Sequence, residues 1–339
     1  MSLWIVRAGK HGEQQATAIN EGVVCHAWNE LPDYSHCTTK DELASLYKRT
    51  YPRESDKQAI TGLSQVWRFA REIQKGDWVA LPLKTASEIA FGRVVGAYQH
   101  KTLAPNVMHI RKVEWFKTVQ RSAFPKDILL SMNSALTVFM VSRNDAESRV
   151  KKILASPDVE DAHETTDTEV DDLADEDVVD LQLTARDEIL KFIQLNFKDH
   201  DLARLVDAVL RAKGYKTAVS PPGPDGGVDI LAGSGPLGFD RPRICVQVKS
   251  GNTPEGQKTF NELCGVVSKF SAEQGLLVSW SGFTNPVKQD ARKDFFKIRL
   301  WDQGDLVDAI LENYEQLDEQ IKGELPLKRI WILVDDDSP

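Results

Sequence analysis

Three residues that could do chemistry together lie in two short stretches of the second half of this 339-residue sequence. Asp229 belongs to the stretch GPDGGVDI (residues 223–230), and Gln247 and Lys249 end the apolar stretch ICVQVK (residues 244–249). Two neighbouring strands that are joined through a Gly- and Pro-rich loop can place these side chains at one edge of a sheet. The spacing therefore predicts a polar site at that edge.

The three side chains suit a metal-assisted reaction at a phosphate. A carboxylate and an amide carbonyl are hard oxygen ligands suited to Mg²⁺, and Mn²⁺ accepts the same ligands. A Lys ammonium can orient the attacking water or stabilise the negative charge that develops at phosphorus. We therefore expect cleavage of nucleic acid, with Asp229 and Gln247 as metal ligands and Lys249 beside the water. The alternative for Asp229 and Lys249 is a salt bridge between neighbouring strands.

The elements around these residues predict an α/β/α sandwich. Helical spacing after the N-cap candidate Thr184, and again from Leu202 to Leu210, predicts two helices, the second ending at Gly214. A buried parallel strand is expected at residues 275–280, because the stretch is short and almost wholly apolar. Further strands are expected at residues 215–219 and 298–301, and further helices at residues 260–267, 285–296 and 303–314.

This half of the chain resembles the Mrr-type branch of the restriction-endonuclease-like nucleases, in the D…QxK form of the PD-(D/E)xK core. The matching pieces come in the family's order: Gly214-Tyr215, residues 225–229, residues 247–249 and the strand 275–279. The resemblance implies that Asp229 is the principal metal ligand, that Gln247 takes the place of a second acid, and that Lys249 polarises the water. It also implies in-line attack that leaves a 5′-phosphate and a 3′-hydroxyl.

One position departs from the family's pattern. Many Mrr-type domains carry a Glu in the first core helix, and the aligned residue here is Ala203. Asp199 and Asp207 lie one turn earlier and one turn later on the same helix face, so either could restore the carboxylate. Asp225, in the Gly-rich turn, is a third candidate, with a solvent-facing structural role as its alternative.

Residues 1–155 mix short strands with helices. A strand is expected at residues 3–6, a helix from Lys40 capped by Thr39, a second helix at residues 60–73, and strands at residues 77–82, 88–96 and 109–115. Together these predict a small, partly closed β-barrel with helices against it. The stretches WRF (67–69), IQKGDWV (73–79) and IAFGRV (89–94) resemble the EVE and YTH branch of PUA-like domains.

That resemblance implies a pocket for a flipped or single-stranded modified base. Such a pocket needs aromatic rings for stacking and polar groups for the edge of the base. Trp28 with Asn29, and Trp67 with Arg68, are the candidates, because neither Trp lies in a clean strand alternation. The alternative is that each Trp packs in the barrel core.

An acidic segment separates the two halves. Residues 156–183 carry 12 acidic residues and no Lys or Arg, whereas residues 1–155 have a net charge of +7 and residues 184–339 a net charge of −4. The overall charge of −9 therefore does not exclude DNA as a partner. We interpret the segment as a flexible linker, with mimicry of nucleic acid as the alternative. The expected domains are then 1–155 and 184–339.

The composition is that of a cytoplasmic protein. No stretch is long and apolar enough for a membrane helix, the N-terminus lacks a signal peptide's apolar region, and the four Cys are widely spread. We therefore expect a modification-dependent, type IV-like DNA restriction endonuclease that uses Mg²⁺. Cutting both strands predicts a homodimer, because one metal site cuts one strand. The alternatives are a non-catalytic reader of modified nucleic acid and a repair or recombination nuclease for structured DNA.

Overall fold

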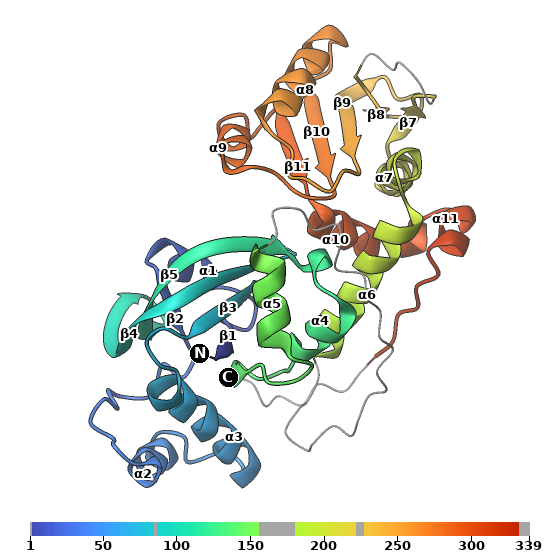
Figure 1. The fold of residues 1–339 in the computed structure, drawn as a ribbon. Coiled ribbons are helices and arrows are strands. Elements are labelled where there is room, and N and C mark those ends of the chain that lie inside the picture. The colour runs from blue at the N-terminus through green and yellow to red at the C-terminus, as the bar shows by residue number, and fades with distance from the viewer. Residues whose placement is uncertain (1, 85–86, 156–179, 222–226, 332–339) are drawn as a thin grey trace. The chain divides into compact units, whose positions relative to one another are not determined.

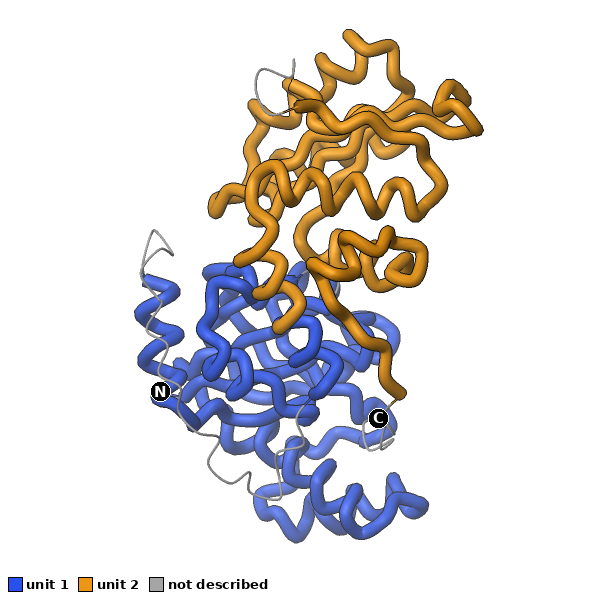
Figure 2. Tube along the Cα trace, turned by 90° about the vertical axis from the view of Figure 1, so that its right-hand side faces the viewer, with its two compact units in different colours: residues 1–187, 332–339 blue, residues 188–331 orange. Residues whose placement is uncertain are grey.

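The computed structural model describes residues 2–84, 87–155, 180–221 and 227–331. The chain divides into two compact units, Met1–Asp187 and Glu188–Trp331, which Figure 2 shows in different colours. Both units combine helices with a sheet in which parallel and antiparallel strands are mixed. No helix among the described residues is long and apolar enough to span a membrane.

The N-terminal unit is built on a six-stranded sheet with the order β2-β5-β4-β3-β1-β6 (Figure 1). The long strands β4 and β5 form an antiparallel hairpin whose register shifts at three places, as bulges do. The strands are β1 (Leu3–Val6), β2 (Val23–Cys25), β3 (Trp78–Leu83), β4 (Glu88–Ala104), β5 (Val107–Gln120) and β6 (Val138–Met140). The helices are α1 (Gln15–Asn20), α2 (Lys40–Thr50), α3 (Asp56–Trp67), the π-helix η1 (Arg68–Glu72), the short 3₁₀-helix η2 (Arg121–Ala123), α4 (Lys126–Met132) and α5 (Ala146–Ala155).

The structure does not confirm the partly closed β-barrel. Within the described residues, β2 pairs only with β5 and β6 only with β1, so the two end strands of the sheet are not joined. The physical reason is that β2 and β6 have three residues each, too short to continue the ladder around, and helices cover the sheet instead. Helices α4 and α5 pack on one face of it, and η1 packs on the other.

One predicted helix start in the N-terminal unit is confirmed, and one predicted helix is divided in two. Thr39 caps α2 with a full capping box, as its position predicts. The helix expected at residues 60–73 is instead α3 followed by η1, in which the Ile73 N–H donates to the Arg68 carbonyl five residues earlier.

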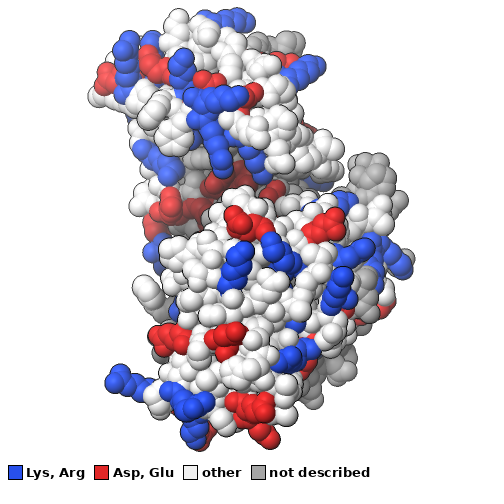
Figure 3. Space-filling model, turned by 90° about the vertical axis from the view of Figure 1, so that its left-hand side faces the viewer, with Lys and Arg blue, Asp and Glu red and all other residues white. Residues whose placement is uncertain are grey.

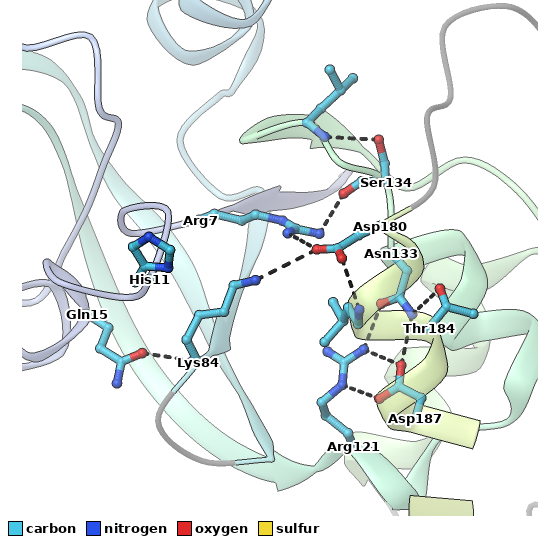
Figure 4. Close-up of polar contacts among 12 residues, drawn as sticks. Arg7, His11, Gln15, Lys84, Arg121, Asn133, Ser134, Asp180, Thr184 and Asp187 are labelled. Atoms are coloured by element: carbon cyan, nitrogen blue, oxygen red, sulfur yellow. Dashed lines mark hydrogen bonds and ion pairs between the residues drawn. The ribbon is translucent and has the colours of Figure 1, made fainter. Parts of the chain in front are cut away.

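The last residues of the acidic segment are anchored in the N-terminal unit (Figure 4). The sequence places residues 180–183 in a linker, whereas helix α6 (Leu181–Asn196) already begins there. Asp180 caps this helix by accepting from the Leu183 N–H at 2.9 Å, and its other oxygen pairs with Arg7 at 2.9 Å. Lys84 lies 3.7 Å from the same oxygen. The rest of the segment, residues 156–179, lies outside the described residues.

A buried ion pair holds the second turn of α6 against the N-terminal unit. Arg121 donates to both carboxylate oxygens of Asp187, each at 2.7 Å, and to Asn133 Oδ1 at 2.7 Å (Figure 4). The side chains of Arg121 and Asp187 are 4% and 6% exposed. Bidentate pairing with a planar guanidinium reduces the cost of burying both charges.

The C-terminal unit is built on a five-stranded sheet with the order β11-β10-β9-β8-β7. In β9 and β10, Val246 and Leu276 face one apolar cluster, whereas Cys245 and Leu277 face another. Helices α7 and α10 cover the first face and α8 and α9 the second, so the predicted layers of an α/β/α sandwich are present. The elements are α7 (His200–Ala212), β7 (Lys216–Val219), β8 (Ile230–Ser234), β9 (Asp240–Lys249), α8 (Gln257–Lys269), β10 (Gln274–Ser279), α9 (Asn285–Lys293), β11 (Ile298–Trp301), α10 (Gln303–Asn313), η4 (Tyr314–Gln316) and α11 (Glu319–Glu324).

Charged side chains of both signs are interspersed on the face that Figure 3 shows. Neither unit presents a surface of a single sign there. The excess of basic residues in the N-terminal half therefore does not by itself locate a binding surface.

Candidate active site

Asp229 and Lys249 line the same cavity of about 450 Å³ in the C-terminal unit. Asp229 immediately precedes β8 and Lys249 is the last residue of β9. Because β8 and β9 are antiparallel, the start of one lies beside the end of the other. The cavity is lined by Asp199, His200, Ser220, Pro221, Asp229, Val248, Lys249, Ser250, Gly251 and Glu255.

The sheet fixes both the backbone and the carboxylate of Asp229. Its N–H donates to the Val246 carbonyl at 2.9 Å, and its own carbonyl accepts from the Ser220 N–H at 2.8 Å. Its Oδ2 accepts from the Val248 N–H at 2.7 Å. A carboxylate with its orientation set in this way is prepared to bind a cation without further ordering.

Lys249 is positioned through its backbone. Its carbonyl accepts from the Trp280 N–H at 2.9 Å, and it lies opposite Ser279 of the parallel strand β10. In the described part of the chain, no carboxylate forms an ion pair with Lys249. The alternative of a salt bridge between Asp229 and Lys249 is therefore not what the structure shows.

Gln247 is held in the sheet beside the cavity rather than lining it. Its Nε2 donates to the Gly227 carbonyl at 2.5 Å, and the residue is 4% exposed. Its Oε1 is buried and has no hydrogen-bond partner among the described residues. A buried acceptor without a partner is costly, so this oxygen is suited to a ligand atom that the protein itself does not supply.

The structure separates the three candidates for the additional carboxylate. Asp199 lines the cavity and its Oδ1 accepts from Ser250 Oγ at 2.7 Å. Asp207 does not line the cavity, its Oδ2 pairs with Arg211 at 2.9 Å, and its buried Oδ1 has no partner among the described residues. Asp225 lies outside the described residues. Asp199 also has a φ of 48°, which is rare for a residue other than Gly and often marks a functional position.

Sequence reasoning missed two residues that line the cavity, Glu255 and His200. Glu255 lies in the loop before α8, pairs with Phe283 in an isolated bridge, and accepts from Thr259 Oγ1 at 2.6 Å. The one signal in the sequence was an acid six residues after Lys249. His200 directly follows Asp199, and it lies in no stretch that pointed to chemistry.

The donor chemistry of the cavity fits a hard divalent cation, although a complete ligand set is not formed. Asp229, Asp199 and Glu255 are carboxylates that line the cavity, and the adjacent Gln247, which does not line it, has a partnerless amide oxygen, Oε1. Mg²⁺ and Mn²⁺ accept both kinds of ligand. Among the residues that the structure describes, no three His, Cys, Asp or Glu side chains are close enough to hold a metal ion together.

The four candidates for a base pocket lie in the N-terminal unit, in or next to one cluster. Trp28 is 2% exposed and packs with Tyr34 and Tyr47, and Trp67 packs partly against the same cluster. Asn29 Nδ2 donates to the Ala27 carbonyl at 3.1 Å. The burial of Trp28 favours its packing alternative, because a ring with both faces covered cannot stack on a base. Trp67 and Arg68 are only partly buried, at the junction of α3 and η1.

Three solved structures match parts of the chain at low sequence identity. "DNA modification-dependent restriction endonuclease AspBHI" is 13% identical, covers 80% of this chain and 74% of its own, and gives a TM-score of 0.34. "MspJI Restriction Endonuclease in Complex with 27-mer Oligonucleotide" is 14% identical to this chain and gives a TM-score of 0.32. The match covers 96% of this chain and 78% of the MspJI chain. "Protein of Unknown Function AF1548" is 17% identical to this chain and gives a TM-score of 0.26. The match covers 40% of this chain and 79% of the AF1548 chain. These likenesses are too weak to assign a function.

Two family models match the sequence itself. Residues 4–141 match a domain of unknown function (DUF8426), and no curated protein matches the chain. Residues 195–310 match a restriction endonuclease family, Mrr_cat, and this range contains Asp199, Asp229, Lys249 and Glu255. The C-terminal unit therefore carries a restriction endonuclease domain, and the chain is an endonuclease.

Proposed function

We propose that this chain is a modification-dependent DNA restriction endonuclease whose cutting site is the cavity at Asp229 and Lys249. The observation that carries the proposal is that these two side chains line one cavity at adjacent strand ends, inside the range that matches the restriction endonuclease family. Domains of the PD-(D/E)xK type generally use divalent metals. We propose Mg²⁺ as the ion, with Mn²⁺ as its substitute.

The side chains in and beside the cavity have separate tasks in this proposal. Asp229, with its carboxylate oriented by the Val248 N–H, would hold the ion together with Gln247 Oε1 and Asp199. A bound divalent ion supplies Lewis acidity at the phosphate and lowers the pKa of a water molecule. Lys249, which has no ion-pair partner in the described part of the chain, would orient that water and stabilise negative charge at the phosphate.

The N-terminal unit is the proposed reader of the modified base. The support is the EVE- and YTH-like pattern of residues 67–94 and the partial exposure of Trp67 and Arg68. Asn29 stays a candidate for the edge of the base, whereas the buried Trp28 is assigned to packing in this proposal. Cleavage of both strands would require two copies of the chain, and a homodimer is the form that we propose.

The test compares duplexes that carry 5-methylcytosine, 5-hydroxymethylcytosine, N6-methyladenine or no modification, each incubated with the full chain and Mg²⁺ or Mn²⁺. We expect one modified duplex to be cut in preference to the plain one. Asp229→Asn and Lys249→Ala should each reduce cleavage at least about a hundredfold, equivalent to about 2.7 kcal/mol of activation free energy, because each removes a group at the reacting phosphate. Both variants should still bind DNA.

Lys258→Ala is the control, because Lys258 is almost fully exposed in α8 and does not line the cavity. It should cut at the rate of the unchanged chain. Equal cleavage of modified and plain duplexes, or a preference for branched DNA, would instead indicate a repair or recombination nuclease. Cleavage that is unaffected by both Asp229→Asn and Lys249→Ala would place the active site elsewhere.

A further inference from the structure

A second cavity, of about 480 Å³, lies in the N-terminal unit, where η1 and the turn after it meet the middle of the β4–β5 hairpin. Its charged residues are Arg71, Lys75 and Arg111, and no Asp or Glu lines it. The remaining lining residues are Ala70, Ile73, Gln74, Val95, Gly96 and Ala97. A cavity with three cations and no carboxylate favours an anionic ligand.

The π-helical turn determines how Arg111 is placed. Arg111 is 3% exposed, and its Nε donates to the Phe69 carbonyl at 2.5 Å while its two terminal nitrogens donate to Gly96 at 3.2 Å and to Ala70 at 2.7 Å. Phe69 and Ala70 belong to η1, where the wider hydrogen-bond pattern leaves carbonyls open to a side chain. A guanidinium has five N–H donors, so two of them are left for a ligand in the cavity.

The positive charge of this cavity is not neutralised by the described part of the chain. Arg71, Lys75 and Arg111 form no ion pair with any described residue. Asp77 is the carboxylate whose charge raises the pKa of Arg111. The Oδ2 of Asp77 accepts from Trp4 Nε1 and from the Gln74 N–H, and not from Arg111. Burial, with a smaller repulsion from Arg71, lowers the pKa of Arg111 to about 10, so the group is still charged at neutral pH.

An anion in the cavity would offset the free-energy cost of burying the positive charge of Arg111. A buried charge without a counter-charge is unfavourable, and a phosphate provides both the charge and the acceptors that guanidinium groups recognise. The lining contains no aromatic ring on which a base could stack, which favours a phosphate over a nucleobase as the group that is bound. Lys75 is exposed and can reach a ligand that lies along the surface. Arg71 is partly buried and its Nη2 donates to the Ser35 and Cys37 carbonyls at 2.8 and 2.5 Å, so its remaining N–H groups are the ones available to a ligand.

We propose that this cavity binds a backbone phosphate of DNA, with Arg71 and Lys75 contacting its oxygens and Arg111 providing fixed positive charge beneath them. The proposal rests on the proposed function only in taking DNA as the ligand. The contact would position the N-terminal unit on a duplex without reading its sequence, since phosphates carry no sequence information.

The experiment measures binding of the full chain to a labelled plain duplex by fluorescence anisotropy, in EDTA so that no strand is cut. Affinity is followed between about 50 and 200 mM salt, because each phosphate contact contributes about one to the slope of log affinity against log salt. Lys75→Ala should weaken binding and reduce that slope by about one. Lys75 makes no ion pair in the described structure, so this variant should keep its fold.

Lys57→Ala is the matched control, because Lys57 is an exposed Lys of α3 in the same unit and does not line the cavity. Its salt slope should equal that of the unchanged chain. Arg71→Gln provides a second variant, which should lower the slope as Lys75→Ala does. A slope that is unchanged in both Lys75→Ala and Arg71→Gln would overturn the proposal.

A second arm separates DNA from small phosphates as the source of the anion. Inorganic phosphate and a nucleoside monophosphate are tested for thermal stabilisation of the chain and of Lys75→Ala. Stabilisation that Lys75→Ala abolishes, with DNA binding untouched, would assign the cavity to a small phosphate and overturn the proposal. Because the assay contains no free divalent metal, a failure of the proposed nuclease activity does not alter its outcome.

Discussion

Asp199 and Asp207 show how one residue's surroundings decide between two equivalent candidates. Helical spacing treats them alike, because each lies one turn from Ala203 on the same face. The structure places Asp199 in the cavity with Asp229, whereas Asp207 pairs with Arg211. The positive φ of Asp199 costs on the order of 1–3 kcal/mol in ordinary residues and is tolerated where the surroundings enforce it. Asp199 is therefore the better candidate for the additional carboxylate.

Replacing Asp199 by Asn should lower both cleavage and metal affinity. Asn accepts a positive φ and keeps the size of the side chain, so the change removes charge and leaves the backbone in place. We expect cleavage to fall about tenfold or more, and binding of Mn²⁺ measured by titration calorimetry to weaken with it. Asp201→Asn is the control, since Asp201 is 53% exposed, pairs with Arg204 and does not line the cavity. Equal behaviour of the two variants would remove Asp199 from the site.

The residues of the candidate site differ in how visible they are in the sequence. Asp229 and Lys249 could be predicted to meet because Asp229 directly precedes one short apolar strand and Lys249 ends the next. Gln247 was found by the same pattern, but its hydrogen bond to the Gly227 carbonyl depends on a turn twenty positions away. Glu255 could not be predicted, because it lies in a loop whose path is fixed by the bridge to Phe283.

At the scale of elements, helix α6 carries a buried ion pair, Arg121–Asp187, at its second turn. Arg121→Ala would leave the Asp187 carboxylate buried without its partner, and we expect the free energy of unfolding to fall by about 3–5 kcal/mol. Arg149→Ala is the matched control, because the Arg149–Asp127 pair is 30% and 26% exposed, and should cost about 1 kcal/mol or less. Urea unfolding of both variants measures the difference. A similar decrease in the free energy of unfolding for Arg121→Ala and Arg149→Ala would show that the buried Arg121–Asp187 pair stabilises the protein no more than the partly exposed Arg149–Asp127 pair.

Elements with a strong local signal were predicted well, and those fixed by distant contacts were not. The strand at residues 3–6 and the capped helix after Thr39 appear as expected. Strand β4 continues to Ala104, eight residues beyond its predicted end, because its exposed second half is ordered by pairing with β5 rather than by an apolar face. The turn η1 also escaped prediction, since Arg111, some forty positions away, satisfies its carbonyls.

At the scale of the whole molecule, the two units have separate apolar cores and different sensitivity to acid. The N-terminal unit contains a stack of buried rings in which His26 and His109 are 4.8 Å apart, with Tyr34 stacked on His109. Burial favours the neutral form of His109, whose Nε2 donates to the Leu31 carbonyl at 3.0 Å and whose Nδ1 lies 2.8 Å from the Tyr98 hydroxyl. Of the seven His in the sequence, only His200 belongs to the C-terminal unit.

Acid should therefore loosen the N-terminal unit first. Burial, followed by repulsion from His100, lowers the pKa of His109 from 6.5 to about 4, and burial also lowers that of His26. Protons then bind the unfolded state more strongly, so stability present above pH 6.5 is lost as the pH falls from about 6.5 towards about 4. For His109 alone the loss at pH 5 is about 2 kcal/mol.

Hydrogen exchange with mass spectrometry at pH 7.5 and pH 5, corrected for the intrinsic rate, measures this loss in each unit separately. We expect strands β2 and β5 to lose protection at pH 5, while β9 and β10 keep theirs, because hydrogen bonds to basic side chains or to the backbone lower the pKa of Glu273, Asp290, Asp318 and Glu324 in the C-terminal unit. The pKa of Glu273, for example, is lowered to about 2 by its hydrogen bonds with Arg243. His109→Gln keeps a polar group in the stack and should reduce the dependence on pH. Equal loss of protection in both units would mean that the buried His stack does not determine the response to acid.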